Sequence, residues 1–235
     1  MKKKKVFCVI NFKGGVGKSS LSSLLSAKMD RRGHKSAVFN IALTQPAEGN
    51  NPTDTIDFGE LLSDDSTLNV KEILNDVKEI YEFVFVDTPG ELSDELVAII
   101  NEIDVFIFPF ESTKLFEVEN KPRGIKDTLA CIESIFSSGI YDRPVADVIM
   151  VCNKYYSDHD VKKQLEYFKE MINKMELLSK VNVNGTALSF SKAMETIDVL
   201  REDIDSLSAK NAIAYRALNK KIDVLVDDVV KFADL

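Results

Sequence analysis

The sequence has 235 residues, of which 45% are hydrophobic, and its formal net charge at pH 7 is −8. This length and apolar content are enough for the core of a single α/β domain over residues 1–235, with no need for a second domain. The negative charge argues against attraction of the whole molecule to nucleic acid. Three cysteines, Cys8, Cys131 and Cys152, argue against a disulfide framework and indicate buried thiols in a reducing compartment.

The residues Lys2–Lys5 precede an apolar run that is too short for a signal peptide, and no later stretch approaches a membrane span. His34 and His159 lie far apart and lack cysteine partners at zinc spacing, so we predict no structural metal. We therefore expect a cytoplasmic protein without a membrane partner.

A glycine-rich run connects the first predicted strand, Val6–Ile10, to the first predicted helix, Lys18–Arg32. Glycines let successive backbone N–H groups turn toward phosphate oxygens, and the helix N-terminus adds partial positive charge. A strand, a glycine turn and a helix in register favour a phosphate-binding loop over a plain turn. The residues expected to bind the nucleotide here are Lys13, Gly14, Gly15, Val16, Gly17, Lys18, Ser19 and Ser20.

Two polar residues at the end of this loop have expected roles in phosphoryl chemistry. Lys18 can reach the β- and γ-phosphates of a nucleoside triphosphate, and we count it as catalytic. The hydroxyl of Ser19 can bind Mg²⁺.

The next predicted elements are a strand at Ala37–Ala42 and a helix at Val70–Tyr81. Between them, Leu43–Ser66 is rich in turn residues and is expected to form surface loops around one helical turn at Phe58–Leu62.

A second nucleotide motif begins at the predicted strand Phe83–Val86, which Asp87 follows directly. This order places a carboxylate at the edge of the sheet where open α/β folds bind ligands, so Asp87 is the candidate Walker B residue for Mg²⁺ and for catalysis. Gly90 could bring a backbone N–H near the γ-phosphate and make this segment a switch. The alternative is an aspartate that only caps the next helix.

The remaining pattern alternates strands and helices, which predicts a single-domain, doubly wound, mostly parallel sheet with helices on both faces. Asp158-His159-Asp160 is interpreted as a helix cap and not as a metal site. Phe106, Phe108, Phe110 and Phe116 could suggest a ligand cage, but alternate phenylalanines on a central strand are interpreted as core. The expected elements are helix Glu91–Glu102, strand Val105–Pro109, helix Pro122–Phe136, strand Val145–Cys152, and helices Asp160–Leu178 and Ala209–Phe232.

The run Asn11–Ser19 departs from the ordinary phosphate-loop pattern because Phe12 stands where a glycine is expected. With its extra lysine, the run resembles the ParA/MinD family of deviant Walker A ATPases. The resemblance implies ATP or ADP as ligand, Mg²⁺ as cofactor and a homodimer formed with ATP. It also implies that Lys13 reaches the partner's nucleotide as a catalytic residue, the alternative being a solvated loop lysine.

Two later strands extend the resemblance over most of the chain. Ile103–Pro109 is similar to a strand of the family that ends in proline, and Val148–Lys154 is similar to the strand that leads to the base-binding residue. Asn153 is therefore the candidate for recognising adenine, because its amide offers a donor and an acceptor. An asparagine that caps the strand end is the alternative.

The clearest departure from the family follows the second strand, where the resemblance implies Asp-x-Asp-Pro-Gln. This chain has Asn40 and Ala42 at the two aspartate positions. Asn40 could still bind a metal-bound water, but Ala42 can neither accept a proton nor orient one. We therefore expect slow ATP hydrolysis. Four nearby residues could supply the function instead: Gln45, Glu48, Asp54 and Asp57.

The expected partners follow from charge. In the last predicted helix, acidic residues flank the apolar stripe of Ile222, Leu225, Val226, Val229 and Phe232, which argues for packing on the core and against a membrane surface. This favours the ParA-like branch. A basic patch for nonspecific DNA and a solvated helix face are alternatives for Lys121, Arg123, Arg201, Lys210, Arg216, Lys220 and Lys221.

The expected function is thus an ATP-dependent dimeric switch in DNA partition, plasmid segregation or cargo positioning, associated with the nucleoid and aided by an adaptor or activator protein. One alternative is an ATP-bound scaffold or regulator that does not hydrolyse ATP and binds a partner protein. Another is a small-molecule kinase or ligase, for which the loops show no acceptor site.

Overall fold

The computed structural model describes most of the chain, including the strands and helices named below. In some positions only the backbone is described. The described ranges are 4–42, 53–111, 123–153, 158–177, 181–186 and 213–232, and within them the side chains of 111, 123–124, 153, 158–161, 184–186, 213–218 and 232 are excepted.

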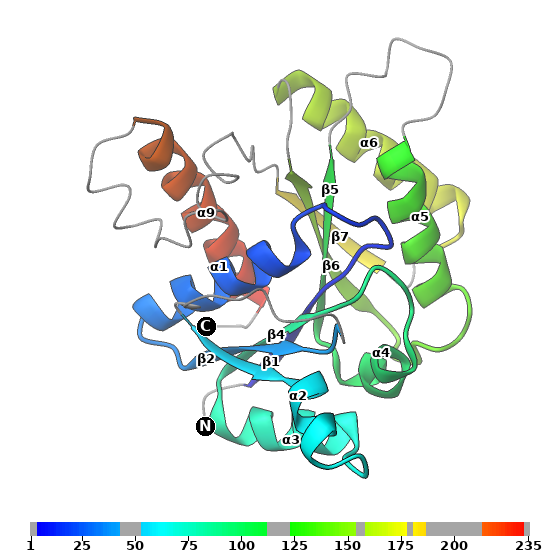
Figure 1. Ribbon diagram of the computed structural model, residues 1–235. Coiled ribbons are helices and arrows are strands. Elements are labelled where there is room, and N and C mark those ends of the chain that lie inside the picture. The colour runs from blue at the N-terminus through cyan, green and yellow to red at the C-terminus, as the bar shows by residue number, and fades with distance from the viewer. Residues whose placement is uncertain are drawn as a thin grey trace.

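The fold is a single α/β domain built on a seven-stranded sheet in the order β3-β2-β4-β1-β5-β6-β7 (Figure 1). All of the neighbouring strands pair in parallel, so every carboxyl end lies on the same edge. The strands are β1 Lys5–Val9, β2 Ser36–Asn40, β3 Asp54–Asp57, β4 Phe83–Asp87, β5 Val105–Glu111, β6 Ala146–Asn153 and β7 Val181–Thr186.

Strand β1 lies between β4 and β5, where the chain reverses its direction of winding, and this is the place where open α/β sheets bind ligands. The strand register brings polar residues into one row at the carboxyl edge. Val9 is opposite Asp87, and Asn40 is opposite Asp87 on one side and Asp57 on the other.

Helices cover both faces of the sheet, and the alternation of side chains in β1 explains why. Phe7 and Val9 belong to one buried cluster, together with residues of α1 and α9. Val6 and Cys8 belong to the other, together with residues of α2 to α6. The helices are α1 Lys18–Arg31, α2 Phe58–Asp64, α3 Val70–Ile80, α4 Asp94–Ile99, α5 Arg123–Phe136, α6 Asp158–Lys174 and α9 Ile213–Phe232, with a 3₁₀ turn η1 at Ile100–Glu102.

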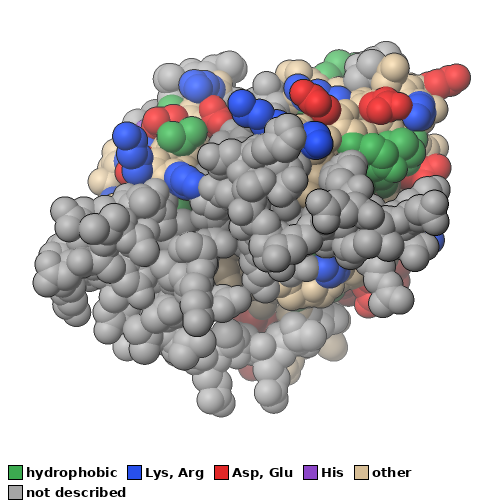
Figure 2. Space-filling model, turned by 90° about the horizontal axis from the view of Figure 1, so that it is seen from above, with side chains coloured by type: hydrophobic (Ala, Val, Ile, Leu, Met, Phe, Trp, Pro, Cys, Tyr) green, Lys and Arg blue, Asp and Glu red, His purple; other side chains and the backbone are tan. Residues whose placement is uncertain are grey.

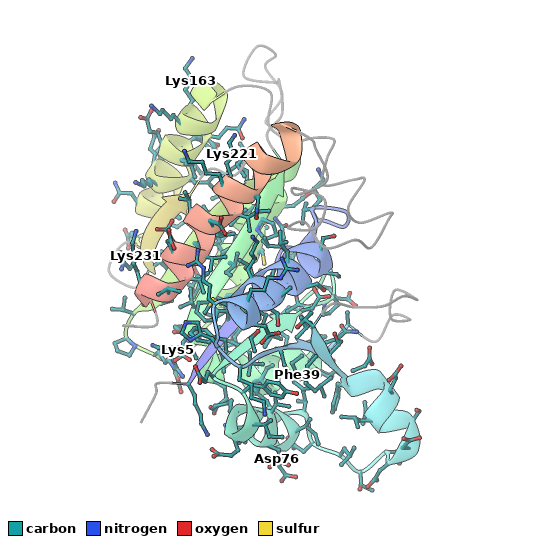
Figure 3. All side chains as sticks on the ribbon, turned by 90° about the vertical axis from the view of Figure 1, so that its left-hand side faces the viewer. Lys5, Phe39, Asp76, Lys163, Lys221 and Lys231 are labelled. Atoms are coloured by element: carbon teal, nitrogen blue, oxygen red, sulfur yellow. The ribbon has the colours of Figure 1, made fainter. Side chains whose placement is uncertain are left out.

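Helix α9 packs along α1, as Figures 1 and 3 show from two directions. Ile222, Leu225, Val226 and Val229 are fully buried, which confirms that this apolar stripe faces the core. The side chain of Phe232 lies outside the described residues. None of the described helices combines the length and the apolar character needed to cross a bilayer.

Polar contacts also join these two helices. Lys28 on α1 is buried and donates hydrogen bonds to Asn219 and Asp223 on α9, while Arg32, which follows α1, lies 2.6 Å from Asp227.

The structure corrects the expected elements in two places. Asp54–Asp57 is strand β3, in a segment expected to form loops, and Val181–Thr186 is strand β7, which was not expected. Helix α2 is the expected turn, extended to Asp64. Asp57 caps it by accepting a hydrogen bond from the Glu60 backbone.

The starts of α4 and α6 also differ from expectation. Helix α4 begins only at Asp94, where Ser93 caps it, because Gly90–Leu92 do not adopt helical structure. Helix α6 begins at Asp158, so that Asp158-His159-Asp160 forms its first turn. Phe106, Phe108 and Phe110 are fully buried, as expected for core residues, whereas Phe116 lies outside the described residues.

Candidate functional site

The glycine-rich loop between β1 and α1 has the backbone shape that phosphate binding requires. Gly15 has φ 73° and Gly17 has φ 87°, a left-handed region that side chains with a Cβ rarely adopt. A Cβ added at Gly14 or Gly15 would meet no described heavy atom within 4 Å, so the loop faces open space. The backbone N–H groups at the start of α1 are available to an anion there.

Lys18 lies at this helix start and is largely buried. Its ammonium lies 3.4 Å from the backbone carbonyl of Lys13, to which it donates a hydrogen bond. Burial lowers the pKa of Lys18, and the nearby carboxylate of Asp87 partly opposes this effect. A phosphate anion in front of the loop would stabilise the charged ammonium in the same way.

Asp87 ends β4 directly beside the loop, in the position expected of a Walker B residue. Burial raises its pKa to about 6, although a hydrogen bond from Ser19 and the charge of Lys18 favour the ionised form. Its Oδ1 atom is buried and has no hydrogen-bond partner among the described residues. A buried carboxylate oxygen of this kind fits a bound cation or a water molecule of its shell.

The residues present therefore fit Mg²⁺ carried in with a nucleotide. Ser19 and Asp87 are hydrogen-bonded to each other, so their oxygens are close enough to share one ion. Across the part of the chain that is described, no three His, Cys, Asp or Glu side chains form a metal-binding group. Nucleotide phosphates would have to supply the other ligands, as is usual for magnesium.

Asn11 is a site residue whose structural role the sequence did not reveal. It is completely buried, and its amide group donates to the carbonyl of Pro109 and to Thr128 Oγ1, both at 2.7 Å. Its Oδ1 accepts a hydrogen bond from the Lys13 backbone at 2.9 Å. Only its place directly before the deviant loop could have indicated this role.

Asn40 lies at the carboxyl edge of the sheet, at the end of β2, and β2 pairs with β4. Its Nδ2 donates to Asp57 Oδ2 at 2.6 Å, and its Oδ1 accepts from the Ala42 backbone at 3.0 Å. Of the residues expected to replace the catalytic aspartates, Asp57 is thus at the site edge. Asp54 lies at the opposite end of β3, where it accepts a hydrogen bond from Tyr81.

Several expected site residues lie outside the described side chains. These include Asn153, whose backbone ends β6, and the loop residues Gln45 and Glu48. Of the expected basic patch, the side chains of Lys220 and Lys221 alone are described, on α9. On the face seen in Figure 2, described Lys and Arg side chains lie among Asp and Glu side chains.

The comparison with known proteins agrees with this geometry. The sequence matches the family model of the CobQ/CobB/MinD/ParA nucleotide binding domain over residues 7–225. No curated protein matches the sequence.

Solved structures share the fold at low sequence identity. The pNOB8 ParA is 14% identical, with a TM-score of 0.69 and coverage of 98% of this chain and 99% of that one. A McdA variant from Cyanothece in complex with ATP is 16% identical, with a TM-score of 0.63 and 98% of each chain covered.

A third such structure is the septum site-determining protein MinD from Pyrococcus horikoshii, complexed with Mg-ADP. It is 13% identical, with a TM-score of 0.56 and coverage of 84% of this chain and 86% of that one. Because the family model spans nearly the whole sequence, the chain belongs to the CobQ/CobB/MinD/ParA nucleotide-binding family.

Proposed function

We propose that this protein is an ATP-dependent dimeric switch of the ParA type, with weak intrinsic ATP hydrolysis. The observation that carries the proposal is the arrangement of Lys13, Lys18 and Asp87 at the carboxyl edge of the central strands. Lys18 donates to the Lys13 carbonyl, and the charges of Lys18 and Asp87 influence each other's pKa.

Different residues of the loop would contact different parts of a bound triphosphate. Gly14 and Gly15 leave space for the phosphates, and the N–H groups at the start of α1 would donate to their oxygens. Lys18 would exchange its contact with the Lys13 carbonyl for the β- and γ-phosphates. Ser19 and Asp87 would hold Mg²⁺, which when bound neutralises phosphate charge.

The extra lysine accounts for the dimer. Lys13 is half-buried at the front of the loop, and its backbone N–H is held by Asn11. A lysine held in this position can reach a triphosphate bound by a second copy of the chain and stabilise its charge in trans.

Slow hydrolysis follows from the residues at the end of β2. Ala42 carries no group that could activate or orient water. The amide of Asn40 is engaged by Asp57 and by the Ala42 backbone, which leaves it one N–H for other contacts. A positioned general base typically contributes a factor of about 10² to 10⁴, so we expect turnover to depend on a partner protein.

Solved relatives suggest which partners such a switch has. One structure shows pNOB8 ParA bound to nonspecific DNA, and another shows a MinC:MinD complex from Aquifex aeolicus. By analogy we propose that the ATP-bound dimer acts in the cytoplasm, at the nucleoid, in DNA partition or cargo positioning. An adaptor or activator protein would then control its release.

Sizing the protein by light scattering with ATP-Mg²⁺ and with ADP-Mg²⁺ tests the proposal. The expected result is a dimer with ATP and a monomer with ADP. Lys18→Ala should lose nucleotide affinity, whereas Lys13→Ala should keep it and lose the dimer. A wild-type protein that stays monomeric at saturating ATP would refute the switch.

A second candidate is a scaffold that binds ATP without turning it over, which Ala42 favours. Phosphate release distinguishes the two, since a scaffold shows none even with a stimulating partner. Gel shift on random duplex DNA with ATP, repeated at raised salt, tests the proposed DNA contact, because phosphate contacts weaken steeply with salt.

A further inference from the structure

Asn11 connects three elements that meet at the phosphate loop. Its amide nitrogen donates two hydrogen bonds, one to the carbonyl of Pro109 on β5 and the other to the hydroxyl oxygen of Thr128 on α5. Its carbonyl oxygen accepts the N–H of Lys13 at 2.9 Å. The side chain is fully buried, so water does not compete for these hydrogen bonds.

Helix α5 contacts the start of the loop at a second point. Cys131 lies one turn after Thr128 on the same face of the helix, and its sulfur accepts a hydrogen bond from the Phe12 backbone. Both side chains are fully buried. Residues 11 and 12 are thereby attached to α5 immediately before Lys13.

The backbone N–H of Lys13 is fixed by Asn11. Lys18 contacts the C=O of Lys13, but a bound triphosphate would replace that contact, whereas the contact with Asn11 would remain. The direction in which a side chain leaves the backbone depends on its φ and ψ, which the contact with Asn11 restricts. Asn11 and Thr128 themselves are buried behind the loop.

We infer that Asn11 and Thr128 are positioning residues, through which α5 sets the direction of the Lys13 side chain toward the partner subunit. The inference rests on the proposed function, in which Lys13 acts in trans. It adds that dimerisation depends on a helix that carries neither the phosphate loop nor the Walker B residue.

Thr128→Val is the test variant, because it removes the hydroxyl that Asn11 uses and keeps the shape of the side chain. Thr128→Ser keeps the hydroxyl and is the matched control. Asn11→Ala is the more direct change, but it leaves buried partners unsatisfied and could unfold the protein. Thermal unfolding of the two Thr128 variants establishes that both are folded.

Two quantities are measured for each variant. The first is the dimerisation constant at saturating ATP-Mg²⁺, and the second is the ATP affinity in a Lys13→Ala background, where binding is separated from dimerisation. We expect Thr128→Val to weaken dimerisation about fivefold, as the loss of one buried hydrogen bond would. Its ATP affinity should stay unchanged, and Thr128→Ser should resemble wild type in both measurements.

Two results would overturn the inference while leaving the proposed function intact. One is a Thr128→Val protein that dimerises as wild type does. The other is a loss of ATP affinity in the Lys13→Ala background as large as the loss of dimerisation, since the contact would then shape the whole loop. A wild-type protein that remains monomeric with ATP would instead refute the proposed function, and the inference with it.

Discussion

The amide of Asn40 on β2 donates a hydrogen bond of 2.6 Å to Oδ2 of Asp57 on β3. The two residues are directly paired across parallel strands, and Asn40 is also paired with Asp87 on β4. The family resemblance implies an acidic side chain at position 40, where this chain has an amide. The nearby carboxylate is that of Asp57, on the strand next to β2 and further from the loop.

This relationship predicts the effect of restoring the acid at position 40. Asn40→Asp places two carboxylates in contact, which removes a hydrogen bond and adds repulsion, so we expect a loss of about 1–3 kcal/mol in the free energy of unfolding at pH 7. Urea unfolding measures it. The double variant Asn40→Asp with Asp57→Asn restores one amide and one carboxylate, so it should recover most of the lost stability. If the double variant is as unstable as Asn40→Asp alone, contact between the two carboxylates is not the cause.

Ala42→Asp tests whether hydrolysis is limited by the lack of a carboxylate. We expect phosphate release to rise at least about tenfold with saturating ATP-Mg²⁺, because a positioned base typically contributes more than that. Ala42→Asn has the same size without the charge and is the control. Equal rates in wild type, Ala42→Asp and Ala42→Asn would contradict this explanation and would point to Gln45 or Glu48 as the residue that orients the water.

Asp87→Asn should stabilise the protein without ligand while weakening its use of Mg²⁺. Burial raises the pKa of Asp87 from an ordinary value of 3.8 to about 6. Keeping this carboxylate ionised at pH 7.5 thus costs about 1–3 kcal/mol, which the amide avoids. Isothermal titration should show that Mg²⁺ no longer tightens ATP binding in the variant.

The pH dependence of the free energy of unfolding, measured for wild type and for Asp87→Asn, tests the sign of this effect. Below the unfolded pKa the side chain is protonated in both states, so its contribution to stability is fully present there. That contribution is lost as the pH rises from the ordinary pKa of 3.8 to the folded pKa of about 6. In urea unfolding, wild type and Asp87→Asn should therefore agree below about pH 4, diverge between about pH 4 and pH 6, and keep a constant difference above that. A difference that is the same at every pH, including below about pH 4, would exclude this cause.

The contacts between α1 and α9 predict an asymmetry between two substitutions. Lys28 is buried, and burial lowers its pKa, with Asp223 opposing the shift. Asp223→Ala leaves that ammonium with less compensation and should cost about 1–2 kcal/mol in urea unfolding. Lys28→Met removes the charge and keeps the packing, so we expect a change of less than about 1 kcal/mol. Equal losses would indicate a contribution from the ion pair itself.

The sequence predicted the parallel sheet because its strands are continuous apolar runs, which is typical of strands buried on both faces. It did not reveal β3, whose residues Asp54–Asp57 are exposed or half-buried and carry no apolar run. Strand β7 reads Val-Asn-Val-Asn-Gly-Thr and lies at the sheet edge, where polar residues and glycine weaken the signal.

The loop residues of the site were predictable because phosphate chemistry constrains neighbouring positions in sequence. Contacts between distant positions were not predictable in the same way. Asn11 donates a hydrogen bond to Thr128, which lies 117 positions later in the sequence, and no local sequence pattern predicts a contact between residues so far apart. Asp57 did carry a local signal, since Asp57–Glu60 has the spacing of a helix cap, but that signal says nothing of its pairing with Asn40.

The packing of α9 on α1 also has a consequence for how the protein is made. Leu21 and Leu25 of α1 belong to a buried cluster that also holds Leu225 and Val229 of α9. A growing chain on the ribosome therefore lacks the α9 part of this cluster until about two hundred further residues have been synthesised. During that interval the side of the nucleotide-loop helix that faces α9 is uncovered apolar surface, and it is a natural substrate for chaperones.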